Sequence, residues 1–207
     1  MVTVSSRRIV PMVRRRTTPK RMGDSVVRAN GATSTGVERT FGKDEIIVSK
    51  TDTKGRITYA NDVFIRVSAY TEAELLGQPH SIVRHPDMPR CVFKLLWDTI
   101  EARQEVFAYV LNLAGDGAPY WVLAHVTPSL DVGGRVVGYH SSRRLPTKRA
   151  LDVIRPLYTS LRTTESRHRR PVEDLAASTA QMGEFLADCG MSYDEYVWSL
   201  AGQSVTV

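Results

Sequence analysis

The sequence predicts an α+β domain that contains one five-stranded antiparallel sheet, with helices on one face and further helices at the C-terminus. Three observations predict this class: five short segments with strand patterning, glycine-containing turns between the later strands, and helix signals between the second and third strands. The order strand–strand–helix–helix–helix–strand–strand–strand favours a single sheet. A length of 207 residues with 42% hydrophobic residues suits one domain with tails, or two small domains.

The strand segments are short apolar or alternating runs bounded by turn residues. We expect strands at residues 46–48, 56–60, 106–113, 120–130 and 135–143. Glycines follow the third and fourth of these strands, where hairpin turns are needed.

Helix signals fill the space between the second and third strands. Asn61 can cap a short helix that runs through Ser68. Thr71 and Glu74 form a capping box for one further turn. The run 92–100 has apolar residues on one side and predicts a helix of roughly three turns.

The chain divides into four segments. Residues 1–42 lack periodicity and are expected to be flexible, and residues 43–146 form the folded domain. Residues 147–163 form an amphipathic flanking helix interrupted by Pro156. Residues 164–207 contain a charged linker and two short helices, whose apolar side chains must pack on the domain, on a second copy or on a partner.

The net charge of +6 comes from the N-terminal segment. Residues 1–40 contain nine basic and two acidic residues, so the remainder of the chain has a net charge of −1. This segment is either a solvated tail or an electrostatic contact for an acidic partner, a membrane surface or nucleic acid. Because no aromatic residues are interleaved with the basic ones, the sequence argues against stacking on nucleic acid.

Cysteine use and hydropathy indicate a cytoplasmic protein. Cys91 and Cys189 have no metal-ligand spacing, which fits a reducing compartment. No apolar run approaches the length of about 18 residues that a transmembrane helix requires. No catalytic triad, paired carboxylates or glycine-rich phosphate loop is recognisable, so we do not expect an enzyme.

The stretch 77–89 is the most unusual in the chain, because three prolines, two histidines, an arginine and an aspartate fall within it. The prolines prevent most of it from forming a strand or a long helix. Such a stiff loop either forms a wall of a cofactor pocket or is a rigid connector that caps the following helix.

Several motifs resemble a known family. The motifs are Ile57-Thr58-Tyr59-Ala60-Asn61-Asp62, Ala69-Tyr70, Leu76-Gly77-Gln78-Pro79-His80, Val83-Arg84-His85-Pro86-Asp87-Met88-Pro89 and Tyr120-Trp121-Val122. Together, over about residues 44–158, they resemble the sensory PAS domain of bacterial aerotaxis receptors. The resemblance implies a PAS fold and non-covalent binding of FAD, whose redox state reports on oxygen or respiratory energy. Ala69 stands where that family usually has a glycine.

The resemblance also implies a set of residues that hold or frame FAD: Asn61, Arg84, His85, Asp87, Trp97 and Asn112. Arg84 and His85 could neutralise phosphate, whereas Asp87 could instead pair with Arg84 and hold the loop. Trp97 could stack on the flavin or simply pack the core. Asn112 could bind the polar edge of the flavin or face solvent.

Two histidines bear on how a flavin would act. His80 stands where the light-sensing relatives have a cysteine, so a thiol adduct cannot form there. Counted from Gly138, His140 occupies the place of their glutamine beside the flavin N5. Our hypothesis is that flavin reduction changes the hydrogen bond or charge of His140; the alternative is a surface histidine.

The function expected from the resemblance is therefore that of a cytoplasmic FAD-based redox or oxygen sensor. It would signal through a protein supplied in trans, such as a chemotaxis transducer or kinase, and a homodimer is also open. The alternatives are a cofactor-free PAS interaction module and a haem sensor with His80 or His85 as axial ligand.

Overall fold

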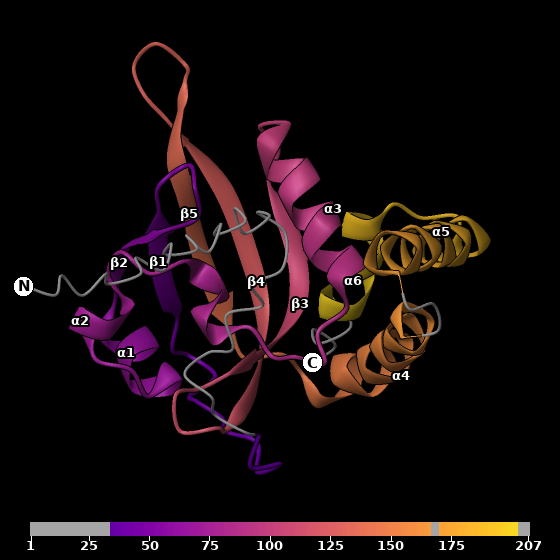
Figure 1. Ribbon diagram of the computed structural model, residues 1–207, viewed down its shortest axis with the longest axis horizontal. Helices are drawn as coiled ribbons and strands as arrows, with labels where there is room; N and C mark the ends of the chain where they lie inside the picture. Colours follow the sequence, from indigo (N-terminus) through magenta and orange to yellow (C-terminus); the bar gives the residue numbers. More distant parts are fainter. Residues whose placement is uncertain (1–33, 167–169, 203–207) are drawn as a thin grey trace, which may run out of the picture.

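The five predicted strands are all present in one antiparallel sheet (Figure 1). The computed structural model describes residues 34–166 and 170–202. The strand order in the sheet is β2-β1-β5-β4-β3, so β2 and β3 form its two edges. The strands are β1 (Ile47–Thr51), β2 (Ile57–Ala60), β3 (Val106–Leu113), β4 (Pro119–Leu130) and β5 (Val136–Arg144).

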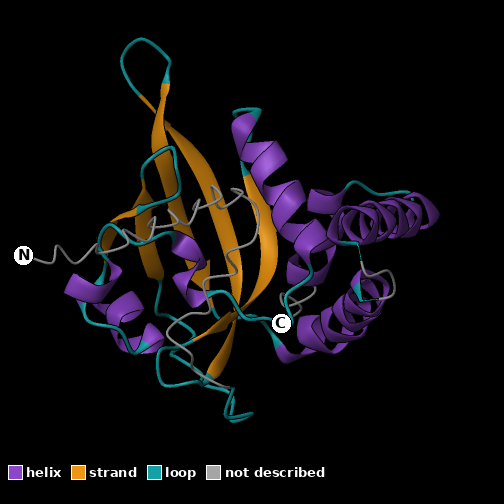
Figure 2. Cartoon of the chain, viewed as in Figure 1, coloured by secondary structure: helices purple, strands orange, loops and turns teal. Residues whose placement is uncertain are grey.

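Three helices and one 3₁₀ turn lie between β2 and β3 in the sequence and cover one face of the sheet, which we call the inner face. They are α1 (Asp62–Ser68), α2 (Glu72–Leu75), the 3₁₀ helix η1 (His80–Val83) and α3 (Arg90–Glu101). Helix α1 contacts β1, α2 contacts β2, and α3 contacts β3 and β4. Figure 2 shows α3 running alongside the strands.

The predicted helix caps are confirmed. The Asn61 side chain accepts a hydrogen bond from the Phe64 amide at 3.0 Å and begins α1. Thr71 and Glu74 form both hydrogen bonds of a capping box at the start of α2. Helix α1 ends at Ala69, whose φ of 54° is left-handed. A glycine adopts that conformation without the steric cost of a Cβ, so this alanine carries backbone strain.

The C-terminal helices pack on the domain, which was one of the three arrangements expected. They are α4 (Lys148–Glu165), α5 (Pro171–Cys189) and α6 (Tyr193–Gly202), and they gather beside β3 (Figure 1). The Tyr158 hydroxyl of α4 donates to the Tyr109 carbonyl of β3 at 2.7 Å. The ring of Trp198 in α6 lies 4.6 Å from that of Phe107.

Phe107 and Trp121 alternate with the inward residues of β3 and β4 and therefore point to the outer face of the sheet. Their rings contact Trp198 of α6 and Tyr158 of α4, so these two helices contact that face. Helix α5 in turn contacts α3 and α4. The expectation of helices on one face therefore holds for the helices between β2 and β3. Near β3 the C-terminal helices cover the other face as well.

Two expected boundaries were wrong. Helix α4 continues through Pro156 and ends at Glu165, two residues beyond the expected end at 163, so the first residues of the expected linker segment belong to this helix. Residues 34–42 pack on the domain instead of being flexible: the amides of Thr35 and Arg39 donate to the carbonyls of Gly117 and Pro119, each at 2.8 Å. Residues 1–33, which include most of the basic segment, lie outside the described residues.

Candidate functional site

A cavity of about 250 Å³ lies between the inner face of the sheet, α3 and the loop that contains η1. Every strand except β2 contributes to its lining. Its strand residues alternate in the sequence, as expected for one face of a sheet: Ser49, Thr51, Val110, Asn112, Ala124, Val126, Tyr139, Ser141 and Arg143.

The stiff loop is fixed at both edges of the sheet and forms one wall of this cavity. At the β2 edge, the Ile57 amide donates to the Gln78 carbonyl at 2.8 Å, and the His80 amide donates to the Gly55 carbonyl at 2.8 Å. At the β3 edge, Arg84 forms an isolated antiparallel bridge with Asn112. The loop therefore crosses the inner face and is held by backbone hydrogen bonds at each end.

Helix α3 forms another wall with apolar and aromatic side chains. Phe93, Leu96 and Trp97 line the cavity from successive turns. Trp97 meets Tyr139 of β5 edge to face, with ring centroids 5.7 Å apart. The guanidinium of Arg84 lies 3.8 Å from the centre of the Phe93 ring, which places a cation at this wall.

Arg143 brings a buried positive charge to the cavity. Its side chain comes from β5 and is 3% exposed at the residue level. Its Nη2 donates to the Ser49 hydroxyl and to His80 Nε2, the latter at 2.6 Å, and its Nε donates to the Ser141 hydroxyl at 3.1 Å. Its Nη1 has no hydrogen-bond partner among the described residues. A buried donor of this kind is costly unless something binds it.

His80 is neutral in this arrangement. Burial and the neighbouring Arg143 guanidinium lower the pKa of His80 to about 3. Because arginine can only donate, His80 Nε2 accepts, and the Ser49 hydroxyl can donate to the same nitrogen at 3.1 Å. Burial lowers the pKa of Arg143 to about 10, so the arginine keeps its charge at neutral pH.

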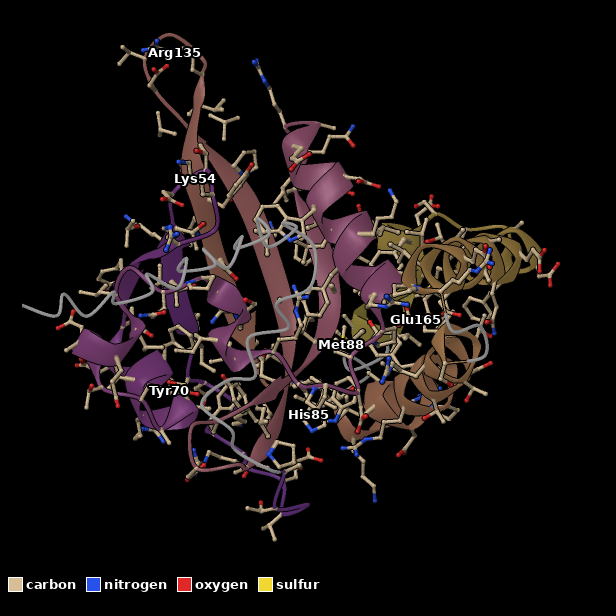
Figure 3. All side chains as sticks on the ribbon, in the orientation of Figure 1. Lys54, Tyr70, His85, Met88, Arg135 and Glu165 are labelled. Carbon is tan, nitrogen blue, oxygen red and sulfur yellow. The ribbon has the colours of Figure 1, made fainter. Side chains whose placement is uncertain are left out.

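The cavity is electropositive. Lys54 (Figure 3), Arg84 and Arg143 line it, whereas the described residues of its lining include no aspartate or glutamate. Asn112, which is 4% exposed, adds an amide on the β3 side. This combination of a flat aromatic wall, an amide and uncompensated cations suits a planar ligand with hydrogen-bond acceptors or negative charge at one edge.

Asn61, expected to hold the cofactor, lies outside the cavity lining and has a structural role. Its Oδ1 accepts hydrogen bonds from the amides of Val48 and Phe64, and its Nδ2 donates to the Ile46 carbonyl at 2.8 Å. The amide group thus joins β1 to the start of α1, with its main hydrogen-bonding capacity used.

His85 and Asp87 also lie outside this cavity. They line a second, more open groove together with Trp121, Tyr158 and Arg162. His85 is 5% exposed, and its Nδ1 accepts a hydrogen bond from the Asp87 amide at 3.1 Å. Figure 3 shows His85 near Met88, just before α3 begins. Their geometry shapes the entry into α3 and does not place them beside Trp97.

His140 lies on the outer face of the sheet, which does not agree with a position beside the cofactor. Tyr139 and Ser141 line the cavity, and strand alternation turns the residue between them away from it. His140 pairs with Lys50 of β1, and burial together with that lysine lowers the pKa of His140. Counting from a glycine placed this residue one position out of phase, and such an offset exchanges the two faces.

Of the seven residues predicted for the site, the structure brings together Arg84, Trp97 and Asn112. Arg143 and Ser49 also line the cavity and were not among the predicted residues. A signal for Arg143 was available, because Tyr139, Ser141 and Arg143 share one face of a strand and a charge on that face must be buried.

The described residues provide neither a metal-binding group nor a membrane-spanning helix. Across residues 34–166 and 170–202, the histidine, cysteine, aspartate and glutamate side chains form no group suited to a metal ion. In the same ranges, each helix is too short or too polar to cross a bilayer.

Residues 46–140 match the protein family described as "PAS fold". The chain is 40% identical over 129 residues to the aerotaxis receptor of Escherichia coli (strain K12), which covers 61% of this chain and 25% of the receptor. It is 29% identical over 158 residues to the nitrogen fixation regulatory protein of Klebsiella pneumoniae, which covers 70% of this chain and 31% of that protein. The chain therefore spans about a quarter to a third of the length of these relatives.

Solved structures also match part of the chain. The dark structure of the LOV domain of the blue-light photoreceptor Aureochrome1 has a TM-score of 0.48 and 23% identity, and covers 53% of this chain and 82% of that one. The PAS domain of the fruit-fly ELK potassium channel has a TM-score of 0.44 and 19% identity. The match covers 47% of this chain and 84% of that one.

Proposed function

Because residues 46–140 form a PAS domain, we propose that this chain binds a flavin, specifically FAD, in the cavity beside Arg143 and reports its redox state. The observation that carries the proposal is the buried guanidinium whose Nη1 lacks a partner among the described residues. The isoalloxazine ring is planar, with an apolar dimethylbenzene end and a polar edge of carbonyl and ring-nitrogen atoms. That distribution matches the aromatic wall and the polar end of the cavity.

Three side chains would hold the ring. Trp97 offers a flat aromatic face from α3, and the Asn112 amide can both donate to and accept from a pyrimidine-like edge. Arg143 can donate from Nη1 to a carbonyl or ring nitrogen. When bound, a flavin supplies reversible electron transfer, and a buried cation at its polar edge favours the state with more negative charge.

The size of the cavity favours a cofactor that extends beyond it. Ligand pockets usually have volumes of about 300–1,000 Å³, so about 250 Å³ suits the ring system alone. The remainder of the molecule would leave through the mouth, where Lys54 and Arg84 are exposed and can neutralise phosphate. A dinucleotide such as FAD would use both of these cations.

The name of one relative supports the proposed sensing role. A relative of this chain is named an aerotaxis receptor, which supports redox or oxygen sensing in aerotaxis or chemotaxis signalling. The cavity holds one serine–histidine contact, between the Ser49 hydroxyl and His80 Nε2 at 3.1 Å. Arg143 donates to the same nitrogen and the pKa of His80 is lowered to about 3, so this imidazole is a poor general base. The described residues also form no metal group, and we therefore propose binding without turnover. The signal would pass to a transducer or kinase supplied in trans in the cytoplasm, with a homodimer as a possible arrangement.

The geometry does not favour a haem. His80 Nε2 is occupied by Arg143 and the Ser49 hydroxyl, and His85 does not line the cavity. An axial ligand needs a free imidazole nitrogen that points at the iron. In a cofactor-free interaction module, the buried Nη1 donor of Arg143 would stay without a partner among the described residues, which is energetically costly.

The absorbance spectrum of the purified protein tests the proposal. We expect flavin bands, and we expect protein stripped of cofactor to regain them with FAD and to reject haemin. Asn112→Leu should weaken FAD binding by about tenfold, because an apolar side chain cannot bond to the ring edge. His140→Ala, on the outer face, is the matched control and should bind FAD as the wild type does. A colourless protein that also rejects added FAD would contradict the proposal.

A further inference from the structure

Helix α3, which forms the aromatic wall of the cavity, begins without a cap of its own. It starts at Arg90 after Pro89, and no side chain of the preceding loop accepts a hydrogen bond at the N-cap position. The first amides of any helix lack partners within the helix and must find acceptors elsewhere. Here the acceptor comes from a distant part of the chain.

Glu165, the last residue of α4, caps the start of α3 from a distant position in the same chain. Its side chain is fully buried. Oε2 accepts a hydrogen bond from the Arg90 amide and Oε1 accepts one from the Cys91 amide, each at 3.0 Å. Oε1 also accepts from the Ser178 hydroxyl of α5 at 3.0 Å. One carboxylate therefore joins the ends or faces of α3, α4 and α5, as Figure 3 shows where these helices meet.

The charges around Glu165 are balanced. Arg90 Nε lies 3.4 Å from Oε2, and Arg162 Nη1 lies 3.5 Å from the same oxygen. The second acidic group nearby, the carboxylate of Asp174, lies 3.9 Å from Arg90 Nη2. The N-terminus of α3 adds the positive end of its dipole. This carboxylate is stabilised as an anion despite its burial.

The position of Glu165 makes α3 and the C-terminal helices mechanically dependent on each other. The same helix that Glu165 caps presents Phe93, Leu96 and Trp97 to the cavity. A hydrogen bond of 3.0 Å is lost when its partners separate by a fraction of an ångström to an ångström. A movement of α3 must therefore either carry α4 and α5 along or break the contact.

We infer that Glu165 is the positioning residue that couples the state of the cavity to the C-terminal helices. In the part that concerns the ligand, this inference depends on the flavin-binding function proposed above. In the part that concerns the helices, it depends on the hydrogen bonds of Glu165 alone. The output surface of the protein is then the α4–α5 pair, and Glu165 is its link to the sensor.

The chain offers a matched control in Tyr158. Its hydroxyl also anchors α4, but it does so to the Tyr109 carbonyl of β3 at 2.7 Å and to the Tyr193 hydroxyl at 3.2 Å. Tyr158→Phe removes these two hydrogen bonds of α4 and none of those that Glu165 accepts from the amides of α3. Glu165→Gln keeps the size of the side chain but replaces one accepting oxygen with a donor, so an α3 amide loses its acceptor.

The experiment is amide hydrogen exchange on the purified full chain, with FAD oxidised and then reduced by dithionite. We expect reduction to change exchange in residues 148–189 of the wild type and of Tyr158→Phe. In Glu165→Gln we expect that difference to disappear while the flavin spectrum remains. Retention of the difference in Glu165→Gln, or its absence from the wild type, would overturn the inference.

A cofactor-free arm separates this inference from the proposed function. In protein stripped of flavin, Glu165→Gln should accelerate exchange of one of the two α3 amides, that of Arg90 or that of Cys91, by about tenfold, while Tyr158→Phe should not. Equal exchange at these amides in Glu165→Gln and wild type would refute the cap, whatever the cavity binds. If Glu165→Gln does not fold, Glu165→Asp keeps the charge with a shorter reach and should give the same acceleration.

Discussion

Two regions of this molecule bury a charge, and they differ in how completely that charge is paired. At the junction of α3, α4 and α5, the two oxygens of Glu165 accept from two amides and a hydroxyl and face two arginines. In the cavity, Arg143 has only neutral partners and one nitrogen without any among the described residues. The first charge is part of the fold, whereas the second has a donor, free among the described residues, for the ligand that we propose.

The pKa shifts follow the same contrast. Burial alone would raise the pKa of Glu165, but the amides of Arg90 and Cys91 and the Ser178 hydroxyl outweigh it, so this pKa lies below its usual value. Burial lowers the pKa of Arg143 to about 10, and no carboxylate in the described lining opposes that shift. A buried ion without a counter-ion destabilises the fold, which is typical of a binding site rather than of a core.

The largest effect on stability should come from a substitution at the junction of α3, α4 and α5, where the buried charge is fully paired. Glu165→Gln should lower the free energy of unfolding by about 3 kcal/mol, because it removes one partner of a buried charged network. Ser178→Ala, which removes a single hydrogen bond to the same carboxylate, should cost only about 1 kcal/mol. Urea unfolding of the two variants measures both values. A loss below that of Ser178→Ala would show that Glu165 is not a structural charge.

Acid should weaken the same junction. Because the folded-state pKa of Glu165 is lowered, its contribution to stability is present above the ordinary value of 4.5 and is lost as the pH falls through the folded value. The difference in unfolding free energy between the wild type and Glu165→Gln should therefore shrink below about pH 4.5. A difference that stays constant from neutral pH to about pH 3 would contradict this.

A smaller effect, on ligand affinity, should show which part of FAD contacts Arg84 at the mouth of the cavity. Arg84→Ala should weaken FAD binding by about tenfold through the loss of a phosphate contact, and should leave riboflavin binding nearly unchanged. Isothermal titration with the two ligands measures this. Equal losses for both would place Arg84 against the ring instead of the phosphates.

The smallest effect concerns a strained residue that belongs to neither region. Ala69→Gly should raise the free energy of unfolding by about 1 kcal/mol, since Ala69 has a left-handed φ of 54°. Thermal unfolding measures it, and FAD affinity should not change. A lower stability would mean that the entropy of the unfolded glycine chain outweighs the relief of strain.

The local pattern of the sequence was enough to predict the fold because each element carries its own signal. The capping box of Thr71 and Glu74, the cap at Asn61 and the alternation of the later strands all act over a few residues. The end of α4 was missed for the same reason. The charged run after Leu161 looks like a linker, and only the distant start of α3 explains why Glu165 is buried.

The residues that line the cavity were predicted in part. Trp97 and Asn112 were implied by the resemblance to the aerotaxis-receptor PAS domain, and both line the cavity. Their local pattern alone left core packing of Trp97 and solvent exposure of Asn112 open. Asn61 and His85 are also unusual locally, but their bonds to Ile46 and to the Asp87 amide serve the fold. His140 was misplaced because the face of a strand depends on its register, which position relative to one glycine does not determine.

The most direct test of the contrast between the two buried charges is one variant measured in two ways. For Arg143→Met, with its exposed neighbour changed in Arg144→Met as the control, the FAD dissociation constant and the unfolding free energy of cofactor-free protein are measured on the same preparation. We predict at least a roughly tenfold weaker affinity and a change in unfolding free energy below about 1 kcal/mol in either direction. Full affinity for FAD together with a loss of stability as large as that of Glu165→Gln would contradict the account.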